Sequence, residues 1–317
     1  MRAHKKLFVF ATVLLAAGVI ICGISFAILG FDIRALNTLN LVTNEYEIDD
    51  DFEHISIRGD IESVVFAVSE EGKCRVVCYE DERDLHSVRV EEDTLTIDKQ
   101  SAGGSFIGII TESPKITVYL PGGAYGALLA DADTGNITVP RGFTFASIQI
   151  KLDTGSIELS ASAEGDIVLN TDTGGIDLRE LSAGDIALSS DTGHIIVENV
   201  TVGGKLKAKT ATGRQDITNA TCVDLYSTGD TGSLYLTSVI ASGEYHIKRD
   251  TGNVRFDGCD AEAIYVETDT GDVAGTLLTD KVFLTETDTG RVDVPKTIAG
   301  GSCAITTDTG NISVSVP

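Results

Sequence analysis

Apolar and polar positions alternate in a fixed pattern around a three-residue unit that recurs through residues 121–317. Nine copies of the unit read Asp-Thr-Gly, a tenth reads Ala211-Thr212-Gly213, and successive copies lie 19 or 20 residues apart. Counted from the first residue of the unit, the positions five before, four after and six after are apolar in every copy, except at Gln215 and Gly275. The position three after is polar or glycine. This alternation predicts two β-strands joined by a corner.

A period near 20 residues is the signature of a solenoid, in which each repeat forms one coil and stacks on the next. Each coil would contain a strand, the corner, a second strand and a looser turn that absorbs the variation in length. Ten coils at a spacing of about 4.8 Å would form a stack roughly 48 Å long. We therefore predict an all-β protein whose residues 121–317 form a parallel β-solenoid (β-helix) of about ten coils.

The repeated tripeptide has a structural explanation. Asp-Thr-Gly also surrounds the catalytic aspartate of aspartic proteases, but those enzymes need two such loops facing each other, whereas stacked corners run along one edge. Glycine can adopt the positive φ of a tight corner. Asp can accept hydrogen bonds from the N–H groups of its own turn, and stacked Thr hydroxyls can bond from coil to coil. The predicted turn glycines are Gly135, Gly155, Gly174, Gly193, Gly213, Gly232, Gly252, Gly271, Gly290 and Gly310.

The aspartates of the repeat would form a column of like charges. At about 4.8 Å, neighbouring carboxylates repel each other by about 0.9 kcal/mol in water. Either N–H groups and solvent satisfy them, or cations lie between the coils. Calcium is the alternative to turn chemistry, although calcium-binding β-rolls have nine-residue, Gly-rich repeats. We expect turn chemistry and no cofactor; the column consists of Asp133, Asp153, Asp172, Asp191, Asp230, Asp250, Asp269, Asp288 and Asp308.

Residues 7–31 are uncharged and almost entirely apolar. As a helix they would span about 37 Å, enough for a bilayer core of about 30 Å. Arg2, Lys5 and Lys6 precede them, which predicts a single-pass cell-membrane anchor with a cytoplasmic N-terminus and the bulk of the chain outside the cell. The alternative is a cleaved signal peptide, because Ser25-Phe26-Ala27 resembles a cleavage site. We expect a retained anchor over residues 1–31, with the bilayer as partner of residues 7–31, and a linker over residues 32–43.

Residues 44–120 lack the repeat but contain strand-like segments such as KITVYLP. We expect them to form a β-rich cap over the membrane-proximal end of the solenoid, because a terminal coil needs covering. At the other end, the sequence stops at Pro317 after the strand NISVSV. We expect an open coil edge there, with Val314 and Val316, that allows self-association or docking of a partner.

Charge and reactive residues narrow the possible functions. The net charge of −24 argues against nucleic acid and anionic lipid as partners. The degenerate coil, which carries Ala211-Thr212-Gly213 in place of Asp-Thr-Gly, is unusually basic because it contains Lys205, Lys207, Lys209 and Arg214. These residues either relieve the self-repulsion of the acidic solenoid or contact an anion or partner. We expect the five cysteines beyond the anchor to be buried small hydrophobes. Histidines and acids form no catalytic or metal-ligand pattern, so we expect no enzyme.

Together, these features resemble a bacterial "putative adhesin" family of β-strand-repeat proteins, a domain-of-unknown-function family. The resemblance covers about residues 44–317 and rests on the order of FEHISIRGDIESV, TLTI, KITVYLP and the TDTGxIxV-like coils. It implies a secreted or membrane-anchored β-solenoid with an adhesion role and no catalytic residues.

We therefore expect a membrane-anchored, non-enzymatic extracellular β-solenoid that acts as an adhesin or cell-surface interaction scaffold, with an unknown surface or membrane-protein partner. The alternatives are an envelope-stress or signalling accessory that acts on a neighbouring membrane protein, and a polysaccharide-active enzyme.

Overall fold

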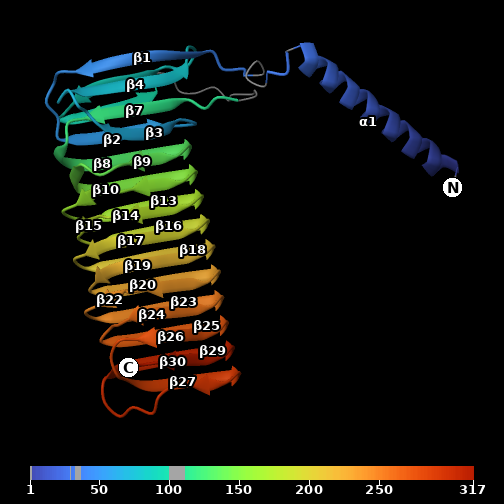
Figure 1. Ribbon diagram of the computed structural model, residues 1–317. Coiled ribbons are helices and arrows are strands. Elements are labelled where there is room, and N and C mark those ends of the chain that lie inside the picture. The colour runs from blue at the N-terminus through green and yellow to red at the C-terminus, as the bar shows by residue number, and fades with distance from the viewer. Residues whose placement is uncertain (1, 29, 33–36, 100–110) are drawn as a thin grey trace.

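The computed structural model describes residues 2–28, 30–32, 37–99 and 111–317 (Figure 1). Helix α1 (Arg2–Ile28) is the element expected as the anchor, and its segment Phe10–Ile28 is long and apolar enough to cross a membrane. Residues 1 and 29 of the expected anchor and residues 33–36 of the expected linker lie outside the described residues. The rest of the described chain forms strands that stack into one long column.

Each repeat contributes one strand to each of two facing sheets. The strand before the corner joins the 14-stranded sheet, through β8 (Gly123–Thr134), β10 (Phe143–Thr154), β13 (Ile167–Thr173), β16 (Ile186–Thr192), β18 (Lys205–Thr212), β20 (Asp224–Thr231), β23 (Glu244–Thr251), β25 (Ala263–Thr270), β27 (Lys281–Thr289) and β29 (Gly301–Thr309). The strand after it joins the 16-stranded sheet, through β9 (Ile137–Val139), β11 (Ile157–Leu159), β14 (Ile176–Arg179), β17 (Ile195–Val202), β19 (Gln215–Cys222), β21 (Leu234–Thr237), β24 (Val254–Cys259), β26 (Val273–Leu277), β28 (Val292–Asp293) and β30 (Ile312–Ser315). Three short strands lie in the looser turns, namely β12 (Ser162–Ala163), β15 (Ser182–Ala183) and β22 (Ile240–Ala241).

Adjacent coils pair in parallel and in register with the repeat. Ile148 of β10 pairs with Ile167 of β13, and Ile157 of β11 pairs with Ile176 of β14. The side chains of all four are buried between the sheets. The prediction of a parallel β-solenoid of about ten coils is thus confirmed, because the alternating apolar residues of both strands fill one continuous core.

The segment before the repeats continues both sheets. It consists of β1 (Leu41–Ile48), β2 (His54–Gly59), β3 (Ser63–Val68), β4 (Cys74–Asp81), β5 (His86–Glu91), β6 (Thr94–Lys99) and β7 (Lys115–Leu120). β2 pairs in parallel with β8, and β3 pairs in parallel with β9, so they form a further coil on the N-terminal side of the first Asp-Thr-Gly corner. Antiparallel pairs then close the stack, with β4 between β1 and β7, and β5 beside β6. β1 begins inside the segment expected to be a linker.

The coils at the C-terminal end do not stack in chain order. β29 lies between β25 and β27, and β30 lies between β26 and β28 (Figure 1). The expectation that the C-terminal coil forms the open edge is therefore wrong, because Val314 is buried between neighbouring coils. The end of the stack is the coil of β27 and β28. Its repeat position Val292 is 45% exposed, whereas the equivalent residues of the inner coils, Gln215 included, are buried.

A buried lysine ties this end coil to the stack. Lys281 of β27 is 2% exposed, and its ammonium donates to Asp260 Oδ1 at 2.6 Å. Lys281 pairs with Gly301 of the inserted strand, which has no side chain in the way. The lysine therefore reaches past the inserted coil to the coil beyond it.

Candidate functional site

The aspartates of the repeat lie at the corner between the two sheets, and all nine are exposed. In the part of the chain that the structure describes, none of these carboxylates accepts a hydrogen bond from an N–H of its own turn. The corner N–H groups donate to the next coil instead, as Gly155 N does to Thr173 O at 2.8 Å. The corner is too extended for the carboxylate to fold back over it, which differs from the hydrogen bonding expected from the sequence.

Two neighbouring positions supply the bonds between coils that were expected from the tripeptide. The residue before the aspartate is often a buried Ser or Thr, and its hydroxyl donates to a glycine carbonyl of an adjacent coil, as Thr171 Oγ1 does to Gly155 O at 2.9 Å. The residue three after the aspartate accepts the N–H of its counterpart, as Asn136 Oδ1 does from Ser156 N at 2.9 Å. Both ladders bond neighbouring corners to each other.

The ten turn glycines share close contact between backbones. A Cβ on any of them would lie 1.6–2.2 Å from a carbonyl oxygen of an adjacent coil. Six of the ten have φ between +138° and +153°, whereas the other four lie outside the left-handed region. Close approach of the coils, rather than a positive φ alone, is thus the requirement common to all ten positions.

The structure places the four basic residues of the degenerate coil on two different faces. Lys205, Lys207 and Lys209 are exposed on the outer side of β18, in the 14-stranded sheet. Arg214 lies past the corner, where its Nε is 2.5 Å from Asp216 Oδ2 and its guanidinium lies 5.1 Å from the ring centroid of Tyr235. A contact with an anion or partner through the lysines stays a prediction, and Arg214 is not part of their cluster.

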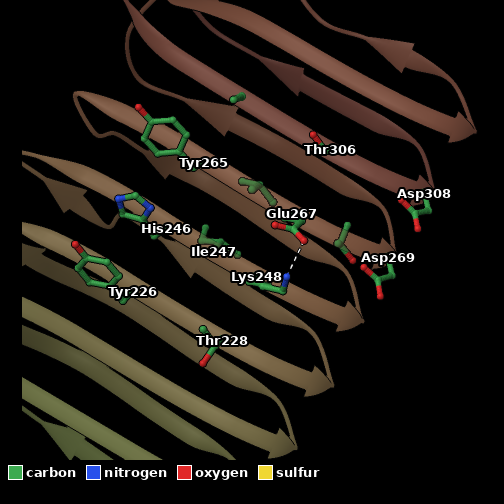
Figure 2. A pocket seen from close by; sticks show the side chains of 13 residues that line it. Tyr226, Thr228, His246, Ile247, Lys248, Tyr265, Glu267, Asp269, Thr306 and Asp308 are labelled. Atoms are coloured by element: carbon green, nitrogen blue, oxygen red, sulfur yellow. Dashed lines mark hydrogen bonds and ion pairs between the residues drawn. The ribbon is translucent and has the colours of Figure 1, made fainter.

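An aromatic ladder begins beside these lysines. Tyr226 of β20, His246 of β23 and Tyr265 of β25 are paired in register on the outer side of the 14-stranded sheet (Figure 2). The ring centroids of Tyr226 and His246 are 4.9 Å apart, and those of His246 and Tyr265 are 5.1 Å apart, with nearly parallel planes. Lys205 Nζ lies 5.6 Å from the Tyr226 ring centroid, so a cation lies at the first rung of the ladder.

A groove separates this ladder from a column of polar side chains. The column lies two residues further along the same strands and comprises Thr228, Lys248, Glu267 and Thr306. Lys248 Nζ and Glu267 Oε1 form an exposed ion pair of 2.7 Å (Figure 2). Asp269 and Asp308 line the groove on its corner side. A ligand lying here would contact aromatic rings on one side and hydrogen-bonding groups on the other.

The groove was not predicted from the sequence, although the pattern of aromatic residues that forms it is present there. All three rings occupy the same position of the repeat, four residues before the aspartate. The other coils place no aromatic side chain there: Lys207 pairs with Tyr226 on one side of the ladder, and Ala304 pairs with Tyr265 on the other. A cluster of aromatic residues in one outward column of consecutive repeats would have predicted an exposed stack, because coils in register bring equivalent side chains together.

A second cluster lies buried in the segment before the repeats. Donor atoms of Cys78, Glu80 and His86 lie within 4.8 Å of one another, an arrangement that could hold a metal ion and that the sequence analysis did not predict. Glu80 is already well satisfied, because its carboxylate accepts from Asn44 at 2.7 Å and from His86 N at 2.6 Å. Burial raises the pKa of the Cys78 thiol to about 12, so the thiol stays protonated. Hydrogen bonding within the cluster therefore competes with metal binding.

The remaining cysteines follow the sequence expectation. Cys74, Cys222, Cys259 and Cys303 are buried and unpaired in the described residues, as is Cys78. The prediction that the five cysteines beyond the anchor are small core residues is confirmed.

Comparison of the sequence with models of known protein families identifies the family of this chain. A family model described as Toastrack DUF4097 matches residues 52–222, more than half of the chain. The chain belongs to the Toastrack family. This confirms the resemblance found in the sequence. The rings and polar side chains of the groove, from Tyr226 onward, lie outside the matched residues, so the family match does not account for them.

Solved structures similar to this Toastrack chain include proteins from Parabacteroides distasonis and Bacteroides fragilis. A "putative adhesin" from Parabacteroides distasonis is 13% identical, covers 87% of this chain and 98% of its own, and has a TM-score of 0.49. A "putative adhesin" from Bacteroides fragilis is 14% identical, with coverages of 88% and 97% and a TM-score of 0.37. A "putative lipid binding protein" from P. distasonis is 15% identical, with coverages of 87% and 98% and a TM-score of 0.45. A comparison with curated proteins gives no match.

Proposed function

We propose that this Toastrack chain is a membrane-anchored, non-enzymatic interaction scaffold of the adhesin type, and that the groove beside the aromatic ladder binds its surface ligand. The observation that carries the proposal is the ladder itself. Three outward-facing rings in register, with Tyr265 exposed and Tyr226 and His246 half-buried, add nothing to the core, which the inward residues of the same strands already fill. Exposed aromatic side chains beside polar groups are characteristic of recognition surfaces.

The anchor would set the position of this surface. Helix α1 would hold the chain in the cell membrane with Arg2, Lys5 and Lys6 in the cytoplasm, because basic residues beside a membrane span favour the inner side. The solenoid would then project outward, and the groove, which lies toward the end of the stack away from β1, would face the surroundings. An extracellular location also suits the strongly acidic composition, which keeps such a surface soluble.

The test measures adhesion with a matched pair of variants. The full chain, displayed on cells, is compared with a variant that carries Tyr226→Ala, His246→Ala and Tyr265→Ala. The control is Tyr235→Ala, which removes an outward ring from the opposite sheet. We expect attachment of cells to a bacterial or host surface to fall only in the triple variant. Equal attachment by the triple variant and the wild type would contradict the role of the groove.

Orientation requires a separate measurement. A protease added to intact cells should degrade the part of the chain beyond residue 32 and spare the first residues. Protection of the solenoid would contradict the extracellular placement, and release of an intact solenoid without α1 would indicate the cleaved signal peptide.

A further inference from the structure

The aromatic ladder stops two coils before the end of the stack. In the register of the 14-stranded sheet, the position after Tyr265 is Ala304 of β29, and the one after that is Leu284 of β27. Tyr265 is 40% exposed and Leu284 is 76% exposed. A methyl group fills little of the space that a phenol ring occupies in the coils below, so one face of the Tyr265 ring is left open above Ala304.

This opening has the thickness of one ring. With coils about 4.8 Å apart, Tyr265 and Leu284 stand on strands about 9.6 Å apart. A six-membered ring above Ala304 would therefore lie about 4.8 Å from each of them. The existing rungs of the ladder have centroid separations of 4.9 and 5.1 Å, which is the same stacking distance. We call the space bounded by Tyr265, Ala304 and Leu284 the ring slot.

The polar column supplies hydrogen-bonding groups at the rim of the slot. Glu267 and Thr306 are paired in register, each two residues beyond Tyr265 and Ala304. The carboxylate of Glu267 accepts hydrogen bonds, and the hydroxyl of Thr306 both donates and accepts. Such groups match the hydroxyls around a sugar ring, whereas a purely apolar ring would offer them no hydrogen bond. Asp269 and Asp308 at the corner add negative charge, which disfavours an acidic sugar.

We propose that the ring slot binds a neutral pyranose unit of a surface glycan, stacked on the open face of Tyr265 with its hydroxyls toward Glu267 and Thr306. The C–H groups on one face of a pyranose carry partial positive charge and suit the negative face of a phenol ring. This inference rests on the proposed function and names the class of its ligand.

The test uses the full chain in a zwitterionic detergent without a sugar headgroup, because glucoside and maltoside detergents would compete for the slot. The probes are the methyl β-pyranosides of glucose, galactose and N-acetylglucosamine, with methyl β-glucuronide as the acidic probe and p-cresol as the planar aromatic probe. Saturation-transfer NMR detects binding. We expect at least one neutral pyranoside to bind, and the glucuronide to bind more weakly.

Two variants locate the binding. Tyr265→Ala should weaken the affinity about tenfold, as expected for loss of one stacking partner. Ala304→Tyr should abolish binding by filling the slot, and it should leave the fold intact because it extends an existing ladder. Tyr235→Ala is the control and should bind as the wild type does. Wild-type affinity in Ala304→Tyr, or binding of p-cresol alone, would overturn the inference.

The two experiments separate an error in the glycan inference from an error in the proposed function. If no pyranoside binds while the triple ladder variant still loses cell attachment, the groove binds another class of ligand and only the glycan inference is wrong.

Discussion

Replacing Gln215 by leucine tests how the solenoid holds a guanidinium in its interior. Gln215 and Arg249 are both fully buried, and Arg249 Nη2 donates to Gln215 Oε1 at 2.8 Å. Ser227 Oγ donates to the same oxygen at 2.6 Å. Gly229 leaves room for the guanidinium, since a Cβ there would lie 1.8 Å from Arg249 Nη1. Arg249 Nε and Nη1 have no hydrogen-bond partner in the described residues.

The magnitudes follow from which group is left unpaired. Gln215→Leu removes a principal acceptor of a buried charge, so we expect a loss of about 3 kcal/mol in the free energy of unfolding. Arg249→Met removes the charge itself, and replacing a buried ion by an apolar side chain is often neutral or stabilising. Burial already lowers the pKa of Arg249 to about 10, which shows that desolvation opposes the charged form here. The double variant should therefore be more stable than Gln215→Leu alone.

Urea unfolding of the full chain, followed by circular dichroism, measures these differences, and hydrogen exchange across β19–β23 locates them. Lys248→Met, on the outer side of β23, is the control and should change stability by no more than about 0.5 kcal/mol. If Arg249→Met proves the more destabilising single change, the guanidinium contributes net stability and the reasoning is refuted.

Three further predictions address the aspartates, the end coil and the cap. Calcium should raise the melting temperature no more than magnesium does at equal concentration, because the nine aspartates of the repeat are exposed and the corners are bonded without them; a calcium-specific rise would establish a metal-binding column. Lys281→Met leaves the Asp260 carboxylate without its buried ammonium, so it should lower the free energy of unfolding by about 3 kcal/mol. It should also reduce hydrogen-exchange protection in β27 and β28 but not in β16. An equal loss in β16 would contradict a local role of this ion pair. The hydrogen bond from Arg89 lowers the pKa of Asp98, so the contribution of this pair is present above the unfolded value of about 3.9 and is lost as the pH falls through the lower folded value. Asp98→Asn should thus lower the free energy of unfolding at pH 6 by about 1 kcal/mol or less, because Arg89 is 36% exposed, and the difference should shrink as the pH falls below about 3.9; a difference as large at low pH as at pH 6 would exclude this cause.

The regular part of the fold could be predicted because every coil repeats the same inward positions. Ile148, Ile167 and their equivalents are apolar in each repeat, and strand periodicity alone assigns them to the core. The polar interior could not be predicted in the same way. Gly229 and Arg249 share the column one residue before the aspartate, whereas Gln215 lies in the column four residues after the repeat's first position, and each looks like an isolated exception until the coils are stacked.

The order of the last coils could not be predicted because the repeats are interchangeable. Any strand with apolar residues at the inward positions can pair with any other, so local sequence does not determine which coil lies beside β25. The choice depends on contacts far apart in the chain, such as the ion pair of Lys281 with Asp260, which requires Gly301 between them. The end coil buries less apolar surface than the inner coils, because Phe283 and Val294 are only partly buried against the core.

The inserted coil also creates the ring slot. In chain order, the coil after Tyr265 is that of Leu284, whose branched side chain would cover the open face of the ring. Insertion of β29 places Ala304 there instead and moves Leu284 one coil further out. The same rearrangement therefore buries the C-terminal strand, exposes the face of the last aromatic rung and sets an aliphatic side chain opposite it. A variant that restored chain order at this end would lose the slot without losing any of its residues, which makes stacking order, rather than residue content, the property that defines this site.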